Sequence, residues 1–152
     1  MRYHLLFTML ALPLLAATLT AQDERAKRQP PDYAKAASDL VTEFFKNWES
    51  RKARQNEPML LGPEATIVTV NQFRGGKHST KPLSAWLADE ERNPPRYLRL
   101  DQVQTDISLG SPAIVKARYT GAGLLGRAVF ALAWTDNGWR ISTVTQEIQF
   151  NW

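Results

Sequence analysis

The chain has 152 residues and a formal net charge of +4, from 19 Lys and Arg against 15 Asp and Glu. Its hydrophobic share of 43% and charged share of 22% exclude a disordered or fibrous chain and are typical of one globular domain. Cysteine is absent, which excludes a disulfide framework and a lipid-modified cysteine. The basic residues are spread over several segments, so we expect a solvated surface and no nucleic-acid partner.

Residues 1–21 have the pattern of a secretory signal peptide. A basic start at Arg2 precedes the uncharged run LLFTMLALPLLAATLT, and polar residues follow Ala21. The run is shorter than the roughly 20 residues that a membrane-spanning helix needs. We therefore expect a secreted or periplasmic protein that is cleaved after Ala21 and has no membrane span afterwards. An uncleaved N-terminal anchor is the alternative.

Residues 22–31 form a polar spacer, and the folded domain is expected over residues 32–152. Asp32 stands at a helix N-cap position, and apolar residues then recur at three-to-four spacing as far as Trp48. This pattern predicts an amphipathic helix of about 20 residues whose apolar stripe belongs to the core. A further helical turn is expected at residues 59–61.

The period of the apolar residues changes to two after this helical region. A strand is expected over residues 65–73, and a second helix begins with Pro82 at its first position and ends before Pro94. The segment 127–134 is apolar at consecutive positions, which predicts a central strand covered on both faces. Four strands are expected to complete the chain, over residues 96–109, 112–120, 126–135 and 138–149.

One long helix, a strand, a short helix and four strands predict an α+β roll with the helices on one side of an antiparallel sheet. This order, with FFKNW on the first helix, ATIVTV opening the sheet and FALAWTDNGWRI near the end, resembles the nuclear transport factor 2-like superfamily. Within it, the chain is most similar to secreted SnoaL-like or lumazine-binding-like members. The resemblance spans about residues 32–149. It implies a cystatin-like cone, a curved antiparallel sheet wrapped around a long N-terminal helix and a shorter helix, with a central pocket.

The resemblance implies no single activity, because this fold carries isomerases, dehydratases, cyclases and non-catalytic binding modules. Alignment with ketosteroid isomerase places Thr69 at the catalytic carboxylate, Phe44 at the catalytic tyrosine and Phe130 at the protonated aspartate. None of these side chains supplies the required group. We therefore expect no isomerase chemistry of that kind.

Other acid–base candidates are few. His78 is the only histidine after the predicted signal peptide, and we expect it in an exposed turn. Without a second histidine or a cysteine nearby it predicts no metal site, and we expect no cofactor. Asp101 and Asp106 alternate with apolar residues in a predicted strand, and we expect them to face solvent rather than the pocket.

The pocket that the resemblance implies is predicted to be mainly aromatic, with amide groups among its walls. A mostly apolar cavity with a few placed polar groups is typical of a small-molecule site, and plain core packing is the alternative for each residue. The candidate pocket residues are Phe44, Phe45, Trp48, Asn71, Phe73, Trp86, Tyr119, Phe130, Trp134 and Gln146.

Three functions stay open at this point. The first is an exported domain that binds a small apolar molecule and is non-catalytic. The second is a SnoaL-like enzyme of the isomerase, dehydratase or cyclase type, with Asp101, Asp106 or Glu147 transferring a proton. The third is a structural homodimer formed through the outer face of the sheet.

The C-terminal strand changes its pattern part-way. Trp139 and Val144 are both expected to be buried, yet strict alternation places them on opposite faces. This change predicts a β-bulge near residues 142–143. With the bulge, Gln146 joins the Trp139 face and Glu147 turns away from it, so the polar residues of this strand divide between two faces.

Overall fold

The computed structural model describes residues 32–72, 75–107 and 112–150 of the chain. The predicted signal peptide and spacer lie outside the described residues. Within the described part, no helix is long and apolar enough to cross a membrane. The elements in chain order are α2 (Tyr33–Glu49), the 3₁₀ helix η1 (Ala53–Met59), β1 (Thr66–Asn71), β2 (Lys77–Pro82), α3 (Leu83–Arg92), β3 (Arg99–Asp106), β4 (Ala113–Gly121), β5 (Leu124–Thr135) and β6 (Gly138–Phe150).

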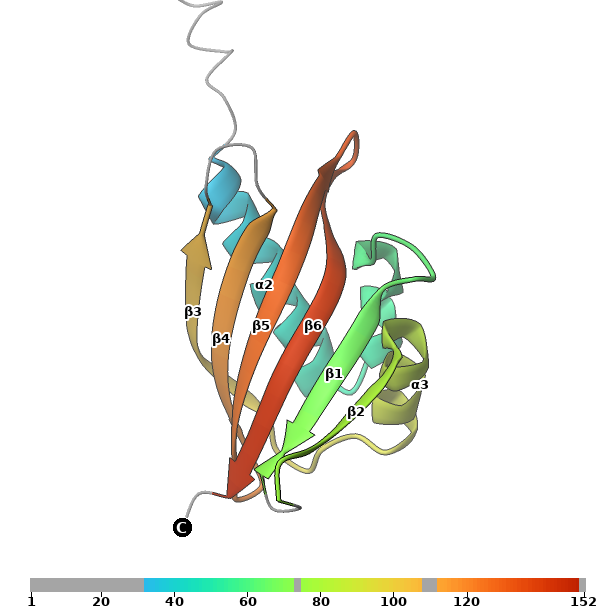
Figure 1. The fold of residues 1–152 in the computed structure, drawn as a ribbon, viewed down its shortest axis with the longest axis vertical. Helices are drawn as coiled ribbons and strands as arrows, with labels where there is room; N and C mark the ends of the chain where they lie inside the picture. Colours follow the sequence, from blue (N-terminus) through green and yellow to red (C-terminus); the bar gives the residue numbers. More distant parts are fainter. Residues whose placement is uncertain (1–31, 73–74, 108–111, 151–152) are drawn as a thin grey trace, which may run out of the picture. The chain divides into compact units, whose positions relative to one another are not determined.

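The strands form one six-stranded sheet in the order β2-β1-β6-β5-β4-β3. Neighbouring strands are antiparallel except β1 and β6, which are parallel. Helix α2 crosses behind β3 to β6, and α3 lies beside β1 and β2 (Figure 1). The structure confirms the predicted α+β fold, and it corrects the expectation of a fully antiparallel sheet at one strand pair.

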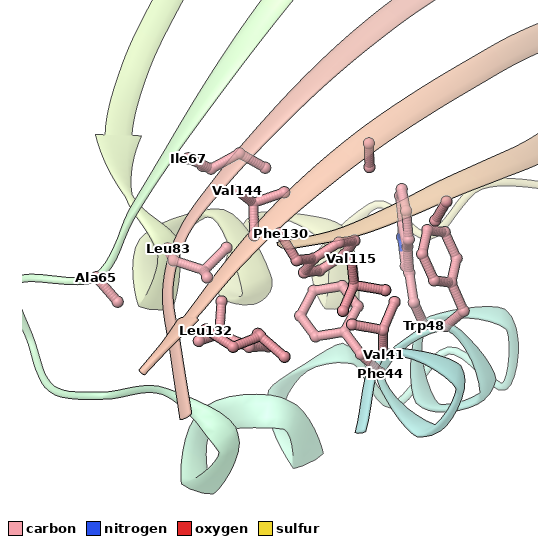
Figure 2. Packing of buried hydrophobic residues seen from close by; sticks show 14 of the residues in the cluster. Val41, Phe44, Trp48, Ala65, Ile67, Leu83, Val115, Phe130, Leu132 and Val144 are labelled. Carbon is pink, nitrogen blue, oxygen red and sulfur yellow. The ribbon is translucent and has the colours of Figure 1, made fainter. Parts of the chain in front are cut away.

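Helix α2 is the main cover of the sheet. The Asp32 side chain caps it by accepting a hydrogen bond from the Lys35 backbone N–H at 2.9 Å, as its N-cap position predicts. Its inward residues recur at three-to-four spacing and meet the sheet residues Val115 and Phe130 (Figure 2). The buried residues of α2 are Ala37, Val41, Phe44, Phe45 and Trp48.

A buried asparagine side chain links the short helix η1 to α2 through two hydrogen bonds. The side chain of Asn56 accepts a hydrogen bond from Asn47 at 2.8 Å and donates one to the Phe44 carbonyl at 2.9 Å. Asn56 is fully buried, so these bonds satisfy a polar group that would otherwise be costly. The helical turn expected at residues 59–61 is found earlier, because η1 ends at Met59.

Strand β2 is absent from the sequence prediction. It pairs with β1 in antiparallel register, from Thr66 opposite Pro82 to Asn71 opposite Lys77. Its residues are exposed at nearly every position, so they show no apolar alternation. Pro82 was expected inside the helix but lies at its N-cap, and α3 begins at Leu83.

Strand β5 is an interior strand, as predicted, but only one of its faces is covered. Phe130 and Leu132 are buried beneath the helices. On the other face Val129 is 39% exposed, and Ala131 is partly exposed. The consecutive apolar residues reflect small alanines on the outer face rather than a second covering layer.

The predicted bulge in β6 is present. Ala131 of β5 pairs with Thr143 and Leu132 pairs with Ile141, so Ser142 is the extra residue of β6. The Ser142 hydroxyl donates a hydrogen bond to the Ala131 carbonyl at 2.9 Å. Because of this extra residue, Trp139, Ile141, Val144 and Gln146 are all buried on the helix-covered side of the sheet.

Candidate functional site

A pocket of about 160 Å³ is lined by residues of α2, α3, β4, β5 and β6 and of the segments next to them. We call it the Glu90 pocket, after the one charged residue among its described lining residues. Most of the residues that line it are aliphatic, aromatic, proline or glycine residues. The lining residues are Trp48, Glu90, Pro95, Leu98, Tyr119, Gly121, Ala122, Leu124, Gln146 and Ile148.

Glu90 projects from the last turns of α3 and is partly buried. Its Oε2 accepts a hydrogen bond from the Trp48 indole N–H at 2.9 Å. Burial raises the pKa of the Glu90 carboxyl, because the charged form loses contact with water. The charge of Asp89 also raises this pKa, whereas the Trp48 hydrogen bond and the charge of Lys81 lower it.

A chain of hydrogen bonds joins two lining residues of the pocket, Tyr119 and Gln146, to Thr69 of β1. The Tyr119 hydroxyl donates to Oε1 of Gln146 at 3.0 Å, and Nε2 of Gln146 donates to the Thr69 hydroxyl at 2.9 Å. Burial, followed by the charge of Glu90, raises the pKa of Tyr119, so its hydroxyl stays protonated. The pocket therefore combines a carboxylate, a neutral phenol and an amide within apolar walls.

The sheet backbone holds the Tyr119 ring in place through a glycine. Tyr119 of β4 lies opposite Gly126 of β5. A Cβ at Gly126 would lie only 2.1 Å from the Cζ atom of Tyr119, so the ring occupies the space that a side chain would fill. Glycine at this position lets the aromatic ring lie against the neighbouring strand.

The structure places three of the candidate pocket residues, Trp48, Tyr119 and Gln146, in the wall of the Glu90 pocket. The other buried rings pack against one another in the core: Phe44 lies 5.2 Å from Phe130 between ring centroids. Phe44 and Trp48 point from α2 toward the sheet (Figure 2). Phe44, Phe45, Trp86 and Phe130 are all buried in this core and do not line the pocket.

The remaining candidate pocket residues lie elsewhere. Asn71 ends β1, opposite Ile148, and does not line the pocket. Phe73 lies outside the described residues. Trp134 is 49% exposed and packs edge-on against Tyr33, with ring centroids 4.7 Å apart, away from the pocket.

The acid–base candidates from the sequence do not line the Glu90 pocket. Asp101 accepts hydrogen bonds from Thr120 and, at 2.8 Å, from Arg99, and these bonds lower its pKa. Asp106 and His78 are exposed. Glu147 lies on the outer face of β6, where bonds from Gln149 and Gln72 lower its pKa. A proton-transfer role for these four residues in this pocket is therefore not supported.

Glu90 is not among the residues expected in the pocket from the sequence, because it lies in the charged run of residues 88–92, which is typical of a solvated helix end. One signal was available. Leu83, Trp86, Leu87 and Glu90 follow three-to-four spacing, so Glu90 lies on the same helix face as three buried residues. A carboxyl on the apolar stripe of a helix is a candidate site residue.

A metal ion or a second small molecule would need its own site among the described residues. Within residues 32–72, 75–107 and 112–150, no group of three or more His, Asp or Glu side chains could hold a metal ion. A second cavity of about 220 Å³ lies on the outer face of the sheet, where the long side chains of Lys116, Arg118 and Arg127 contribute to its wall. The charges of Arg118 and Arg127 act on the carboxylates of Asp101 and Glu147, so this surface carries both signs of charge, and the homodimer expected through the outer face stays a prediction.

No family model matches the sequence, and no curated protein matches it. Solved structures do match. A nuclear transport factor 2-like protein of unknown function from Shewanella baltica has a TM-score of 0.64 at 16% identity, over 77% of this chain and 94% of that chain. A domain with a cystatin-like fold from Nostoc punctiforme has a TM-score of 0.61 at 12% identity, over 81% of both chains.

A third similar structure is named as a candidate dehydratase of the nuclear transport factor 2-like family, from Streptomyces avermitilis. It has a TM-score of 0.60 at 15% identity, over 81% of this chain and 100% of that chain. At sequence identities this low, structural similarity shows a shared fold and does not show a shared function. The described chain therefore has the cystatin-like fold of nuclear transport factor 2-like proteins, which confirms the predicted architecture.

Proposed function

We propose that this chain binds a small, mainly apolar molecule in the Glu90 pocket. The observation that carries the proposal is the pocket itself, a cavity of about 160 Å³ with apolar walls and a few placed polar groups. An apolar cavity of about 150 Å³ in another protein takes up benzene. A ligand with the size of one aromatic ring therefore suits this pocket.

Binding without catalysis is the function that the lining residues support best. Apart from Glu90 and Tyr119, the described lining residues carry no titratable side chain, and none is a serine, threonine, cysteine or histidine nucleophile. The Tyr119 hydroxyl proton is engaged by Gln146. Binding of a small molecule through shape and a few hydrogen bonds needs only the polar groups of Glu90, Tyr119 and Gln146.

A fragment screen tests this proposal. Leu124 lines the pocket, whereas Leu125 is the next residue along the same strand and is absent from the lining. We expect ring-sized fragments to bind the wild type and Leu125→Trp but not Leu124→Trp, because the larger tryptophan side chain at residue 124 occupies space in the pocket. Ligand-observed NMR measures the binding. Fragments that bind Leu124→Trp as well as the wild type, or a screen without binders, would overturn the proposal.

Proton transfer is the second candidate, and the raised pKa of Glu90 favours it. A carboxyl with its pKa moved toward neutrality is suited to general acid–base catalysis. The fold is shared with the candidate dehydratase from Streptomyces avermitilis. If Glu90 transfers protons, a bound fragment that has a C–H next to a carbonyl group exchanges that hydrogen with D₂O in the wild type and not in Glu90→Gln. Absence of exchange in the wild type rejects this candidate for the fragments tested.

A further inference from the structure

The neighbouring carboxylates of Asp89 and Glu90 differ in the number of ion pairs that they form. Asp89 forms an ion pair with Lys81 at 2.8 Å and a second ion pair with Arg92. Glu90 receives only the neutral indole N–H of Trp48, and among the described residues no cationic side chain forms an ion pair with it. Lys81, whose charge lowers the pKa of Glu90, forms its ion pair with Asp89, so the Glu90 carboxylate has no direct ion-pair partner among the described residues.

The other polar groups of the pocket do not supply such a partner. The described lining residues include no lysine, arginine or histidine. The Tyr119 hydroxyl donates its hydrogen bond to Gln146, so toward a ligand the phenol oxygen can only accept a hydrogen bond. With a carboxylate and a phenol oxygen as acceptors, the pocket favours a ligand that donates hydrogen bonds.

A carboxylate next to aromatic rings has the composition of a site for an ammonium group. The ring centroids of Trp48 and Tyr119 lie 5.4 Å apart with the planes at 61°. Indole and phenol rings attract cations, and a partly desolvated carboxylate strengthens this attraction. The walls formed by Leu98, Leu124 and Ile148 then contact the apolar body of the ligand.

We propose that the ligand of the Glu90 pocket is an organic monocation, an ammonium group on an apolar body of about the size of one ring. The ammonium donates to the free carboxylate oxygen of Glu90, and the body lies between the apolar walls. This inference rests on the proposed function, because it assigns a chemical class to the ligand of that pocket. Non-specific attraction is disfavoured, since the chain itself carries a net charge of +4.

Three probes of equal size and different charge separate the two proposals: benzylamine, benzyl alcohol and benzoate. We expect the wild type to bind benzylamine about tenfold or more tightly than benzyl alcohol, and benzoate most weakly. Glu90→Gln keeps an oxygen that accepts from Trp48 and removes the charge. We expect it to bind benzylamine and benzyl alcohol about equally. Isothermal titration calorimetry measures each affinity.

The controls separate the outcomes. Glu49→Gln removes an exposed charge on α2, outside the pocket, and is expected to keep the preference for benzylamine. Leu124→Trp is expected to bind none of the three probes. Benzyl alcohol that binds the wild type as tightly as benzylamine, or a preference that persists in Glu90→Gln, overturns the cation proposal and leaves the pocket proposal standing. Failure of all three probes to bind the wild type overturns both.

The charge state of Glu90 supplies a readout that does not depend on a variant. Glu90 is surrounded by Lys81 from β2, Asp89 from α3 and Tyr119 from β4. Benzylamine stays protonated while Glu90 ionises, so its affinity rises as pH increases from about 4 to about 8. Benzyl alcohol lacks this dependence. A benzylamine affinity that does not change across this range overturns the assignment to Glu90.

Discussion

At the scale of single residues, each polar group of the Glu90 pocket forms only one or two hydrogen bonds, so a single substitution tests each bond. The Tyr119 hydroxyl donates to Gln146, which is only 4% exposed. Tyr119→Phe removes this donor and leaves a buried amide oxygen with one partner fewer. We expect the free energy of unfolding to fall by about 1–2 kcal/mol.

Urea denaturation measures this change, and Tyr97→Phe is its control. Tyr97 is 49% exposed, and its hydroxyl has no described hydrogen bond. A change at an exposed site of this kind is expected to stay within about 0.5 kcal/mol of the wild type. Equal stabilities of Tyr119→Phe and Tyr97→Phe would show that the bond to Gln146 contributes nothing.

Glu90 leads to a prediction about stability and pH. Because its pKa is raised in the folded protein, the folded state binds more protons than the unfolded state above the ordinary glutamate pKa of about 4.3. The free energy of unfolding therefore falls, through this residue, as pH rises from the unfolded pKa through the folded pKa. We expect Glu90→Gln to lack this decrease and to be more stable than the wild type at neutral pH.

Chemical denaturation at a series of pH values between about 4 and about 8 checks this prediction. The exposed residue Glu49 provides the matched control, and Glu49→Gln is expected to follow the wild-type curve. Parallel curves for Glu90→Gln and the wild type over the whole range would contradict a raised pKa at Glu90.

At the scale of the elements, the pairing of β4 with β5 sets the position of Tyr119. Gly126→Ala introduces a Cβ into the space that the Tyr119 ring occupies. We expect a loss of about 1–3 kcal/mol in the free energy of unfolding, because the ring must move. The same substitution in a Tyr119→Leu background is expected to cost little, and the double-mutant cycle measures the difference. Additive effects would show that ring and glycine do not interact.

The bulge of β6 determines which side chains face the helices. Deletion of Ser142 removes the extra residue, and regular alternation then keeps Ile141, Val144 and Gln146 on the helix-covered side. We expect this variant to keep cooperative unfolding. Deletion of the exposed Thr145 instead shifts the strand by one residue and turns Gln146 to the outer face, so we expect that variant to lose cooperative unfolding. Ser142→Ala removes only the bond to the Ala131 carbonyl and is expected to cost about 1 kcal/mol. Thermal denaturation followed by circular dichroism compares the variants, and a Thr145 deletion that unfolds as cooperatively as the Ser142 deletion would contradict this role of the bulge.

At the scale of the whole molecule, we propose that the chain is exported and that cleavage after Ala21 leaves a mature protein beginning at Gln22. The proposal rests on the apolar run and the polar residues after it. Expression of the whole chain in a bacterium, fractionation and intact-mass measurement test it. A variant without residues 1–21 is expected to stay in the cytoplasm. An uncleaved chain in the membrane fraction would instead support an N-terminal anchor.

Much of the fold could be predicted because its signals are local. Apolar spacing in residues 33–48 predicts α2, and the change of parity between Trp139 and Val144 predicts the bulge. Strand β2 could not be predicted in this way, because both of its faces are exposed and β1 alone holds it in the sheet. The parallel pairing of β1 with β6 joins distant segments and has no local pattern.

The sequence by itself determined the periodicity of α2, α3, β1 and β6 and the burial of Trp48 and Tyr119. Tertiary structure alone decided which of the buried residues border a cavity and which fill the core. It also decided the role of Glu90. Its spacing places it on an apolar helix face, but its pKa depends on desolvation by packed neighbours and on the ion pairs that engage the nearby cations. These neighbours come together only in the folded chain.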